Sequence, residues 1–339
     1  MKVLPKNILV VKNRALGDSI MGLSSISYLK QHLPKAKITY AIPGWIHPLY
    51  LNCSSDADKY LPLNLSTPFD YLKLAGLLVA QKFDLIIELH QTGRTSRFFK
   101  IYSILTKTKY IYHNHNLKTG RFIFDQGIKK PSIQRDLDCC YSTLVKYINL
   151  DLQIPNYLHY PPTLNTASTN KEKLIVLGVV ATRKTKLWPI ENYIELIKLI
   201  LDNYGDYKFI IPLSTNAIDQ NIKKILTKIN LPSSVKIIEN PLATLPEIMA
   251  KGTIYIGNDT GLKHLAIALN LITFTFFGPE EPLEWHPYDS STHKYFFIND
   301  LECRIKTSHY CGLDTCDNHS CLNQISVEST FQEIRQHLF

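Results

Sequence analysis

No run of about 20 apolar residues occurs in the sequence, so no membrane-spanning helix is expected. The N-terminal apolar run is short, is broken by Lys12 and Arg14, and lacks a small-residue cleavage site, which argues against a signal peptide. We therefore expect a cytoplasmic protein. Acidic residues are scarcer than basic ones, 29 against 38 Lys and Arg. The resulting net charge of +9 indicates an anionic partner, unless it reflects only a Lys- and Ile-rich genome.

The C-x₂-C pairs of common zinc sites are also missing among the seven cysteines. Four cysteines near the C-terminus are separated by seven, four and four residues, with two histidines between them: Cys303, Cys311, Cys316 and Cys321, with His309 and His319. In a reducing compartment we expect these thiols to be reduced or opportunistically paired, with a structural metal as the alternative. The sequence also lacks clusters of lysine and arginine with aromatic residues between them, so no nucleic-acid partner is expected.

The 339 residues are enough for two domains of roughly 150 residues each. Short apolar runs alternate with helical patterns, which is typical of parallel sheets covered by helices. The strands expected in the first half are residues 8–12, 37–42, 84–89 and 110–113, and the helices are 19–33, 71–81 and 137–148. A segment rich in proline and small polar residues, 151–173, reads as a linker.

The alternation then restarts. The expected strands are residues 174–180, 208–211, 235–239, 253–257 and 272–276, and the expected helices are 190–204, 217–229, 245–251 and 261–269. The sequence thus predicts an α/β fold of two Rossmann-like, doubly wound domains that face a cleft, 1–160 and 161–325. A last helix, 326–339, is expected to pack back on the N-terminal domain.

The segment GNDTGLKHLAIAL, residues 257–269, places three good N-cap residues between a strand and a helix. Gly261 lets the backbone approach a ligand closely. The free N–H groups of the helix start attract a phosphate, and Lys263 and His264 lie in the first turn. An ordinary capped helix is the alternative interpretation.

A second segment, RALGDSIMGLSSI at residues 14–26, follows the first strand and carries Asp18 at the start of a helix. This carboxylate can cap the helix, or it can accept a proton from a sugar hydroxyl as a general base. The dinucleotide fingerprint G-x-G-x-x-G is absent here.

Two further loops belong to the same edge of the second sheet. In ATRKTKLWPIENY, residues 181–193, hydroxyl and ammonium groups suited to a diphosphate precede Pro189, although a solvated basic loop is the simpler reading. In FFGPEEPLEWHPY, residues 276–288, acids and aromatic residues follow the last strand, and a rigid turn with surface acids is the alternative.

Taken in chain order, these segments resemble the lipopolysaccharide heptosyltransferases, glycosyltransferase family 9, from residue 8 to about residue 335. The matching residues are Gly-Asp at 17–18, Thr182, Lys-Leu-Trp-Pro at 186–189, the whole of 257–269, Phe-Gly-Pro at 277–279, Trp-His-Pro-Tyr at 285–288 and Cys-Leu-Asn-Gln-Ile at 321–325. Gly22, Ser24 and Ala181 depart from the pattern of that family.

The resemblance implies a GT-B fold with the acceptor site in the first domain and the nucleotide sugar in the second. It implies an inverting, metal-independent transferase that moves a heptose or related sugar from an ADP-sugar to a lipopolysaccharide core or lipid A acceptor. Asp18 would be the general base. The donor would be held by Thr182, Lys186, Asp219, Asp259, Thr260, Gly261 and His264, of which Asp219 stands near the position of a ribose-binding acid. Peripheral contact with the inner membrane follows from such a lipid acceptor and the positive charge.

Arg94 and Arg97 can contact an anionic acceptor, or they can be solvated loop arginines. Two other functions suit the same architecture. A nucleotide-sugar epimerase or hydrolase would turn over the donor without an acceptor. A non-catalytic nucleotide-sugar-binding protein would keep its function after Asp18→Ala.

Overall fold

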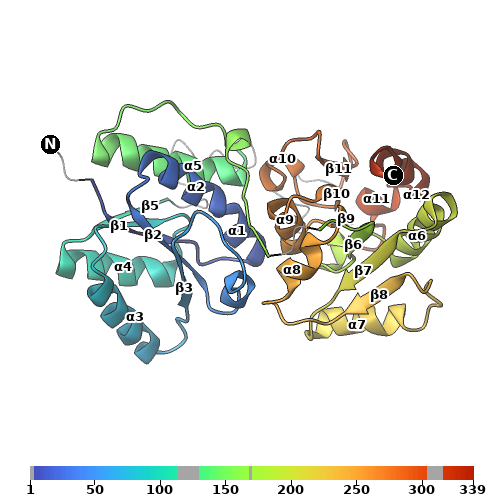
Figure 1. Cartoon of the computed structure of the whole chain (residues 1–339), viewed down its shortest axis with the longest axis horizontal. Coiled ribbons are helices and arrows are strands. Elements are labelled where there is room, and N and C mark those ends of the chain that lie inside the picture. Colours follow the sequence, from blue (N-terminus) through green and yellow to red (C-terminus); the bar gives the residue numbers. More distant parts are fainter. Residues whose placement is uncertain (1–3, 114–129, 168–169, 304–315) are drawn as a thin grey trace. The chain divides into compact units, whose positions relative to one another are not determined.

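The computed structural model describes residues 4–113, 130–167, 170–303 and 316–339, and it divides the chain into two compact units, Met1–Asn165 and Thr166–Phe339 (Figure 1). Each unit is a parallel β-sheet with helices on both faces, which confirms the predicted α/β class. The boundary falls after residue 165 rather than after residue 160. The reason is that the backbones of Ser54 and Asn165 pair, which fixes the end of the linker to the first unit.

The first sheet has the strand order β3-β2-β1-β4-β5, and all neighbouring strands are parallel. Its strands are β1 (Asn7–Val11), β2 (Lys37–Pro43), β3 (Lys59–Leu63), β4 (Leu85–Glu88) and β5 (Lys109–Tyr112). The strand order reverses between β1 and β4, and sheets of this kind bind ligands beyond the carboxyl ends of the strands at that point. The sequence did not predict β3, an edge strand that contains Pro62.

The helical segments of the first unit cover both faces of its sheet (Figure 1). They are α1 (Leu16–Met21), α2 (Leu23–His32), η1 (His47–Tyr50), α3 (Pro68–Gln81), α4 (Gly93–Thr106), α5 (Ser132–Thr143), η3 (Leu144–Ile148) and η4 (Tyr157–His159). Helices α3 and α4 cover one face, where Leu74, Leu78 and Phe99 pack on Leu9 and Val11. Helices α2 and α5 pack against each other on the opposite face.

The single helix predicted at 19–33 is divided at Gly22 into α1 and α2. The side chain of Tyr40 causes the division, because its hydroxyl donates to the carbonyl of Ser19 at 2.7 Å. In one continuous helix that carbonyl would accept from the backbone of residue 23. A Cβ on residue 22 would lie 2.1 Å from the Tyr40 hydroxyl oxygen, so only glycine fits there.

The second sheet has the order β11-β10-β9-β6-β7-β8 and is also parallel throughout. Its strands are β6 (Leu174–Gly178), β7 (Lys208–Pro212), β8 (Val235–Ile238), β9 (Ile254–Asn258), β10 (Ile272–Phe277) and β11 (His293–Phe297). The order reverses between the central strands β6 and β9. The short edge strand β11 was not predicted from the sequence.

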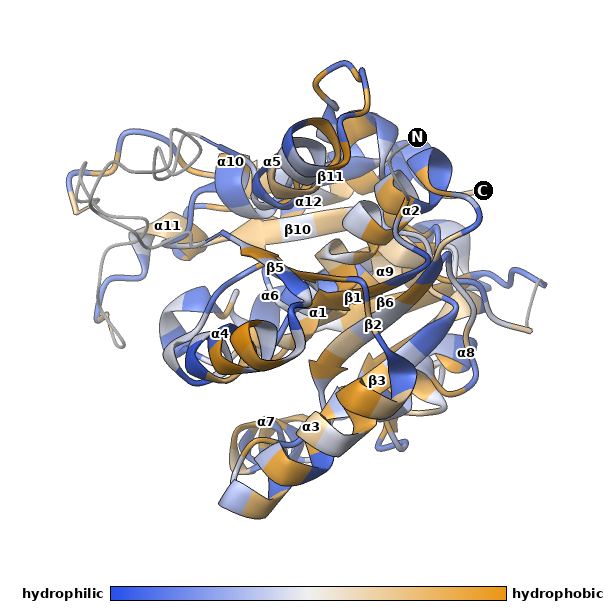
Figure 2. Cartoon of the chain, turned by 90° about the vertical axis from the view of Figure 1, so that its left-hand side faces the viewer, coloured by the Kyte–Doolittle hydropathy of each residue, from blue (hydrophilic) through white to orange (hydrophobic). Residues whose placement is uncertain are grey.

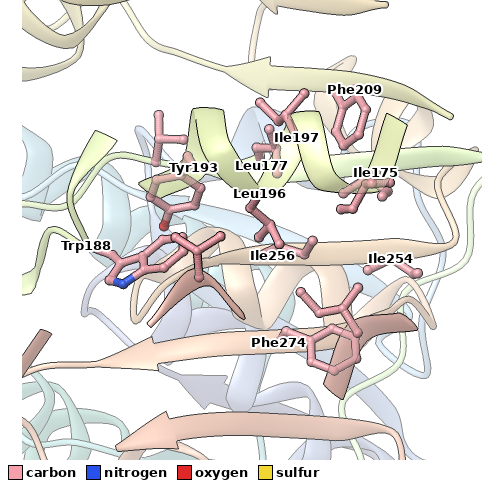
Figure 3. Packing of buried hydrophobic residues seen from close by; sticks show 14 of the residues in the cluster. Ile175, Leu177, Trp188, Tyr193, Leu196, Ile197, Phe209, Ile254, Ile256 and Phe274 are labelled. Atoms are coloured by element: carbon pink, nitrogen blue, oxygen red, sulfur yellow. The ribbon is translucent and has the colours of Figure 1, made fainter. Parts of the chain in front are cut away.

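The helical segments of the second unit are η5 (Lys184–Lys186), α6 (Ile190–Tyr204), α7 (Ala217–Leu226), α8 (Leu245–Ala250), α9 (Gly261–Ala268), α10 (Pro282–Trp285), α11 (Ser320–Asn323), α12 (Val327–Ile334) and η6 (Arg335–His337). Figure 3 shows the core under α6, where Tyr193 and Leu196 lie over Leu177 and Ile256.

The C-terminal helix α12 packs against α6, inside the second unit. Its apolar residues Phe331 and Ile334 belong to the same core cluster as Tyr193 and Leu196 of α6. The second unit thus holds this helix through its own core, and the expectation that the helix also packs on the N-terminal domain stays a prediction. Within the described residues, no helix is both long and apolar enough to cross a membrane.

Candidate active site

The reversal point of the second sheet brings together the loop after β6 and the start of α9. A close approach of the two central strands makes this junction: Gly178 of β6 and Gly257 of β9 are register partners. A Cβ on Gly257 would lie 2.7 Å from the Cα of Gly178 and 2.5 Å from the hydroxyl of Tyr255. Glycine is thus required at this crossing, and both loops leave their strands from the same place.

The loop after β6 is fixed by Trp188. Its backbone N–H donates to Oδ1 of Asn258 at 2.9 Å, and its indole N–H donates to the carbonyl of Ile325 at 3.0 Å. The indole ring is 1% exposed and stacks on Phe276 with the ring centres 4.0 Å apart. Because Asn258 immediately precedes Asp259, this anchor sets the position of the loop relative to the start of α9.

Asp259 is the centre of the charged cluster on these loops. Its two carboxylate oxygens accept from Lys186 at 2.8 Å and from Lys263 at 2.7 Å. Lys263 is fully buried, and its ammonium also donates to the carbonyl of Trp285 at 2.8 Å. Lys186 remains 15% exposed and lies 3.5 Å from Oε1 of Glu280, which also pairs with Arg183.

The electrostatics of this cluster follow from burial and pairing. Burial alone would raise the pKa of Asp259, but the charges of Lys186 and Lys263 and their hydrogen bonds hold it far below the ordinary value. Burial lowers the pKa of Lys263 to about 8, and the charge of Asp259 opposes that shift. Asp259 is therefore an anion at neutral pH, held between two cations.

Helix α9 begins directly after this aspartate. Thr260 is its N-cap residue, with an extended backbone and no side-chain cap hydrogen bond, and Gly261 is its first residue. The first N–H groups of a helix have no partner inside the helix and carry the positive end of its dipole. Together with the exposed part of Lys186, they form a surface that can bind the phosphates of a nucleotide.

The remaining predicted donor residues occupy different places. Thr182 is exposed on the loop after β6. His264 points into the interior, where Nδ1 lies 2.5 Å from the hydroxyl of Tyr288, and burial lowers its pKa, so the ring is neutral. Asp219 lies in the first turn of α7, where its carboxylate accepts from the backbone N–H of Ser214 at 2.6 Å. This contact gives Asp219 a capping role at the end of the neighbouring strand β7.

A cavity of 810 Å³ lies between the loop after β6 and helix α7. Apolar side chains from both elements line it, among them Ala181, Leu187, Ile218 and Ile222, and Thr182 stands at its edge. Cavities of this size and character bind flat, largely apolar ligand groups.

In the first unit, Asp18 lies in the first turn of α1, just after β1 and beside the point where the strand order reverses. Burial raises the pKa of Asp18, whereas the charges of Lys12 and Arg14 and a backbone hydrogen bond from Ala15 lower it. The raised pKa suits a carboxylate that takes up a proton during a reaction. The hydrogen bond from Ala15 shows that the same side chain also caps the helix.

Behind Asp18 lies a buried ionic cluster that the sequence analysis did not identify. The ammonium of Lys12, at the end of β1, is 2.6 Å from Asp136 of α5. His113, after β5, contacts the other oxygen of that carboxylate at 3.0 Å. Three segments far apart in the chain thus meet at one sheet edge, and no local spacing in the sequence indicates it.

Arg94 and Arg97 lie on the first turns of α4, and both side chains are exposed. Of the four C-terminal cysteines, Cys303 is exposed, Cys316 and Cys321 are partly buried, and Cys311 lies outside the described residues. In the part of the chain that the structure describes, no group of three or more His, Cys, Asp or Glu side chains could hold a metal ion.

Several known proteins resemble this chain in sequence or in fold. The profile of glycosyltransferase family 9 (heptosyltransferase) matches residues 71–315, more than half of the chain. Lipopolysaccharide heptosyltransferase 1 of Campylobacter coli is 22% identical over 97% of this chain and 98% of its own length. The E. coli ADP-heptose lps heptosyltransferase II has the same fold, with a TM-score of 0.71 and 19% identity over 98% of each chain.

A second solved structure, E. coli heptosyltransferase WaaC with ADP, has a TM-score of 0.69 and 17% identity, over 97% of this chain and 99% of its own. These structures have the GT-B fold that the resemblance implied. The chain belongs to glycosyltransferase family 9, the heptosyltransferase family, and is a glycosyltransferase.

Proposed function

We propose that this enzyme transfers a heptose from ADP-heptose, with inversion, to a lipopolysaccharide core or lipid A acceptor. One observation carries the donor half of the proposal: Lys186, still partly exposed, lies beside the open N-terminus of α9 at the reversal point of the second sheet. A diphosphate needs this combination of an ammonium group and free backbone N–H donors. The solved relative with bound ADP supports adenine as the base.

In this reading the donor diphosphate takes Lys186 away from its carboxylate partners. Asp259 can release Lys186 because its other oxygen stays bound to the buried Lys263. The adenine ring would enter the 810 Å³ cavity beside Ile218 and Ile222. Lys186 and the N–H groups of α9 would then stabilise the charge that develops on the departing diphosphate, so we propose a reaction without a metal ion.

Asp18 is the proposed general base on the acceptor hydroxyl, because burial has raised its pKa toward the range in which a carboxylate accepts protons well. Arg94 and Arg97 are proposed to contact the phosphates of an anionic acceptor. Thr182, Thr260 and Gly261 complete the proposed donor site. His264 and Asp219 would act through the elements that they fix, His264 through Tyr288 and Asp219 through Ser214.

Thermal unfolding tests the donor half. ADP or ADP-heptose at a hundred times its dissociation constant should stabilise the native state by about 2.7 kcal/mol, which raises the melting temperature by roughly 5–10 °C. UDP, GDP and CDP should have little effect. The response should disappear in Lys186→Ala and persist in Lys198→Ala, a matched change at an exposed lysine of α6. A selective response to UDP or GDP would indicate that the donor is a sugar linked to that nucleotide instead of to ADP. No response to any nucleotide would contradict the proposed donor site.

A transfer assay tests the other half. Product should form only when donor and acceptor are both present, and Asp18→Asn should lower the rate by about 10²–10⁴ while the ADP response stays intact. Turnover of the donor alone would favour an epimerase or hydrolase. An unchanged rate in Asp18→Asn would remove this residue from the mechanism.

A further inference from the structure

The outward faces of α3 and α4 in the first unit carry six large apolar side chains that are mostly exposed. On α3 these are Phe69 (62%), Leu72 (69%) and Val79 (56%), and on α4 they are Ile101 (60%), Ile104 (78%) and Leu105 (78%). Figure 2 shows hydrophobic positions along both helices. We call this surface the α3–α4 face.

These side chains are not part of the core of the unit. The inward residues Leu74 and Leu78 of α3 and Phe99 of α4 already cover the sheet. Phe69, Leu72 and Val79 follow one another at spacings of three and seven, which places them on one side of the helix, away from that inward face. Each helix is thus apolar on two sides, whereas a helix on a protein surface normally has a polar outer side.

The two helices contact each other, so their outward apolar residues belong to neighbouring elements. The rings of Tyr71 on α3 and Phe98 on α4 lie 5.6 Å apart between the two helices. An apolar surface that spans two adjacent helices is larger than the scattered single residues found on most soluble proteins, and it marks an interaction site.

The charge on the same helices is strongly biased. Four basic residues stand against one acid: Lys73, Arg94, Arg97 and Lys100 against Asp70. The carboxylate of Asp70 is occupied by the helix cap, where it accepts from the backbone N–H groups of Ser66 and Thr67. Two more lysines, Lys82 and Lys107, follow the C-terminal ends of the two helices.

We propose that the α3–α4 face docks on an anionic lipid surface. Aliphatic and aromatic side chains flanked by long basic ones are what such a surface binds, because the apolar groups enter the boundary of the acyl chains while the ammonium and guanidinium groups meet the lipid phosphates. An acidic protein would satisfy the charges, but it would need matching apolar pockets for side chains that stand on convex helix faces. A bilayer surface adapts to them.

The inference deepens the proposed function and rests on it for its purpose, since a lipid-linked acceptor lies in such a surface. The binding of the α3–α4 face to lipid does not itself involve the sugar or the nucleotide. Vesicle binding can therefore be measured without donor and acceptor, and the ADP response can be measured without vesicles. Loss of one with retention of the other tells which of the two proposals fails.

Flotation of the full chain with phosphatidylcholine vesicles, with or without phosphatidylglycerol, tests the proposal. The protein should float only with the anionic vesicles, and added salt should weaken the binding. Each lysine or arginine near an anionic surface increases the partition coefficient of the protein onto vesicles about fivefold. Lys73→Glu with Lys100→Glu should therefore lower this coefficient by more than tenfold. Ile104→Ser with Leu105→Ser should lower it similarly by removing the buried apolar area.

Matched changes in the second unit serve as controls. Lys198→Glu with Lys224→Glu on α6 and α7, and Leu283→Ser on α10, alter equally exposed charges and one apolar residue, and they should leave vesicle binding unchanged. All variants should keep the wild-type melting temperature and ADP response, since every substituted side chain is exposed. This check separates lost docking from lost folding.

Four results would overturn the proposal. The first is that the wild-type chain does not bind anionic vesicles. The second is that the α3–α4 variants bind them as well as the controls do, and the third is that the controls lose binding to the same extent as those variants. A change of the oligomeric state caused by Ile104→Ser with Leu105→Ser in the absence of vesicles would also overturn it, because the face would then be a contact between protein chains.

Discussion

Replacing Asp259 by asparagine removes the carboxylate that two ammonium groups share, at distances of 2.8 Å from Lys186 and 2.7 Å from Lys263. The two lysines then differ in their fate. Lys186 is partly exposed and can turn to water or to Glu280, which is 3.5 Å away. Lys263 is fully buried; it keeps its hydrogen bond to the carbonyl of Trp285 and its contact with the ring of Phe277, but its charge loses its counter-ion.

Removal of one partner from a buried ion pair costs about 3–5 kcal/mol, because the other charge stays buried without compensation. For a unit of this size each kcal/mol corresponds to about 2–4 °C in melting temperature. Asp259→Asn should therefore lower the melting temperature of the second unit by roughly 6–20 °C at pH 7.

The pH dependence gives a second signature. In the wild type, burial lowers the pKa of Lys263 to about 8, and the charge of Asp259 keeps it from falling further. In the variant this pKa should be lower than in the wild type, so Lys263 loses its proton in the native state at a lower pH, while it stays protonated in the unfolded state. Unfolding then takes up a proton, and stability rises by about 1.4 kcal/mol per pH unit. The stability of the wild type rises in this way only above pH 8. The difference in unfolding free energy between the wild type and the variant should therefore shrink between pH 7 and 8.

Denaturant unfolding at pH 7, 8 and 9 measures these effects on the wild type, Asp259→Asn, Lys263→Met and the double variant. The double variant should recover at least half of the stability lost in Asp259→Asn, since the uncompensated charge is gone. Asp206→Asn is the matched control, because its carboxylate is 64% exposed in its pair with Lys173 and should leave the midpoint unchanged.

The reasoning would be refuted if Asp259→Asn lost less than about 1 kcal/mol, well below the cost of an uncompensated buried charge. It would also be refuted if the double variant were no more stable than Asp259→Asn alone. A deficit that stayed constant between pH 7 and 8 would show that Lys263 does not titrate in that range.

Two further predictions concern the first unit. Gly22→Ala should lower the free energy of unfolding by about 1–3 kcal/mol, because its Cβ would lie 2.1 Å from the buried Tyr40 hydroxyl. Gly76→Ala, whose Cβ would have no atom within 4 Å, should raise that free energy by about 0.5–1 kcal/mol, and denaturant unfolding measures both. The transfer rate should fall as the pH falls through the pKa of Asp18, which burial raises above the ordinary value, because only the carboxylate accepts a proton; this acid limb should vanish in Asp18→Asn, and an unchanged limb would assign it to another group.

Much of the architecture could be predicted from the sequence because buried parallel strands are apolar runs bounded by turn residues. Helix α6 was predicted with the observed bounds, Ile190–Tyr204, since its buried residues recur at helical spacing. The edge strand β3 was missed because Pro62 within it argues against a strand, and β11 has no fully buried residue to mark it as one. Helix α4 was missed because apolar residues occur on both its inward and outward sides, which hides the helical period.

Candidate site residues could be chosen from the sequence where polar residues follow a predicted strand. Asp259 directly follows β9, whereas Asp18 and Lys186 lie in the helical segments that come next after β1 and β6, and the structure places Lys186 and Asp259 in contact. The burial of Lys263 could not be predicted. Its spacing of four from Asp259 is that of an ordinary surface pair on a helix, whereas its burial depends on tertiary contacts with the carbonyl of Trp285 and the ring of Phe277.

The two lysines that pair with Asp259 are buried to different extents, so one of them contributes to stability and the other is available to a ligand. Lys263 is fully buried and offers nothing to a ligand, so its removal should be visible in unfolding experiments. Lys186 is 15% exposed, and Asp259 keeps Lys263 as a partner without it, so Lys186→Ala should change stability little. If the proposed donor site is correct, Lys186→Ala abolishes the ADP response in a protein that is nearly as stable as the wild type. Asp259→Asn, in contrast, should reduce stability before any nucleotide is added.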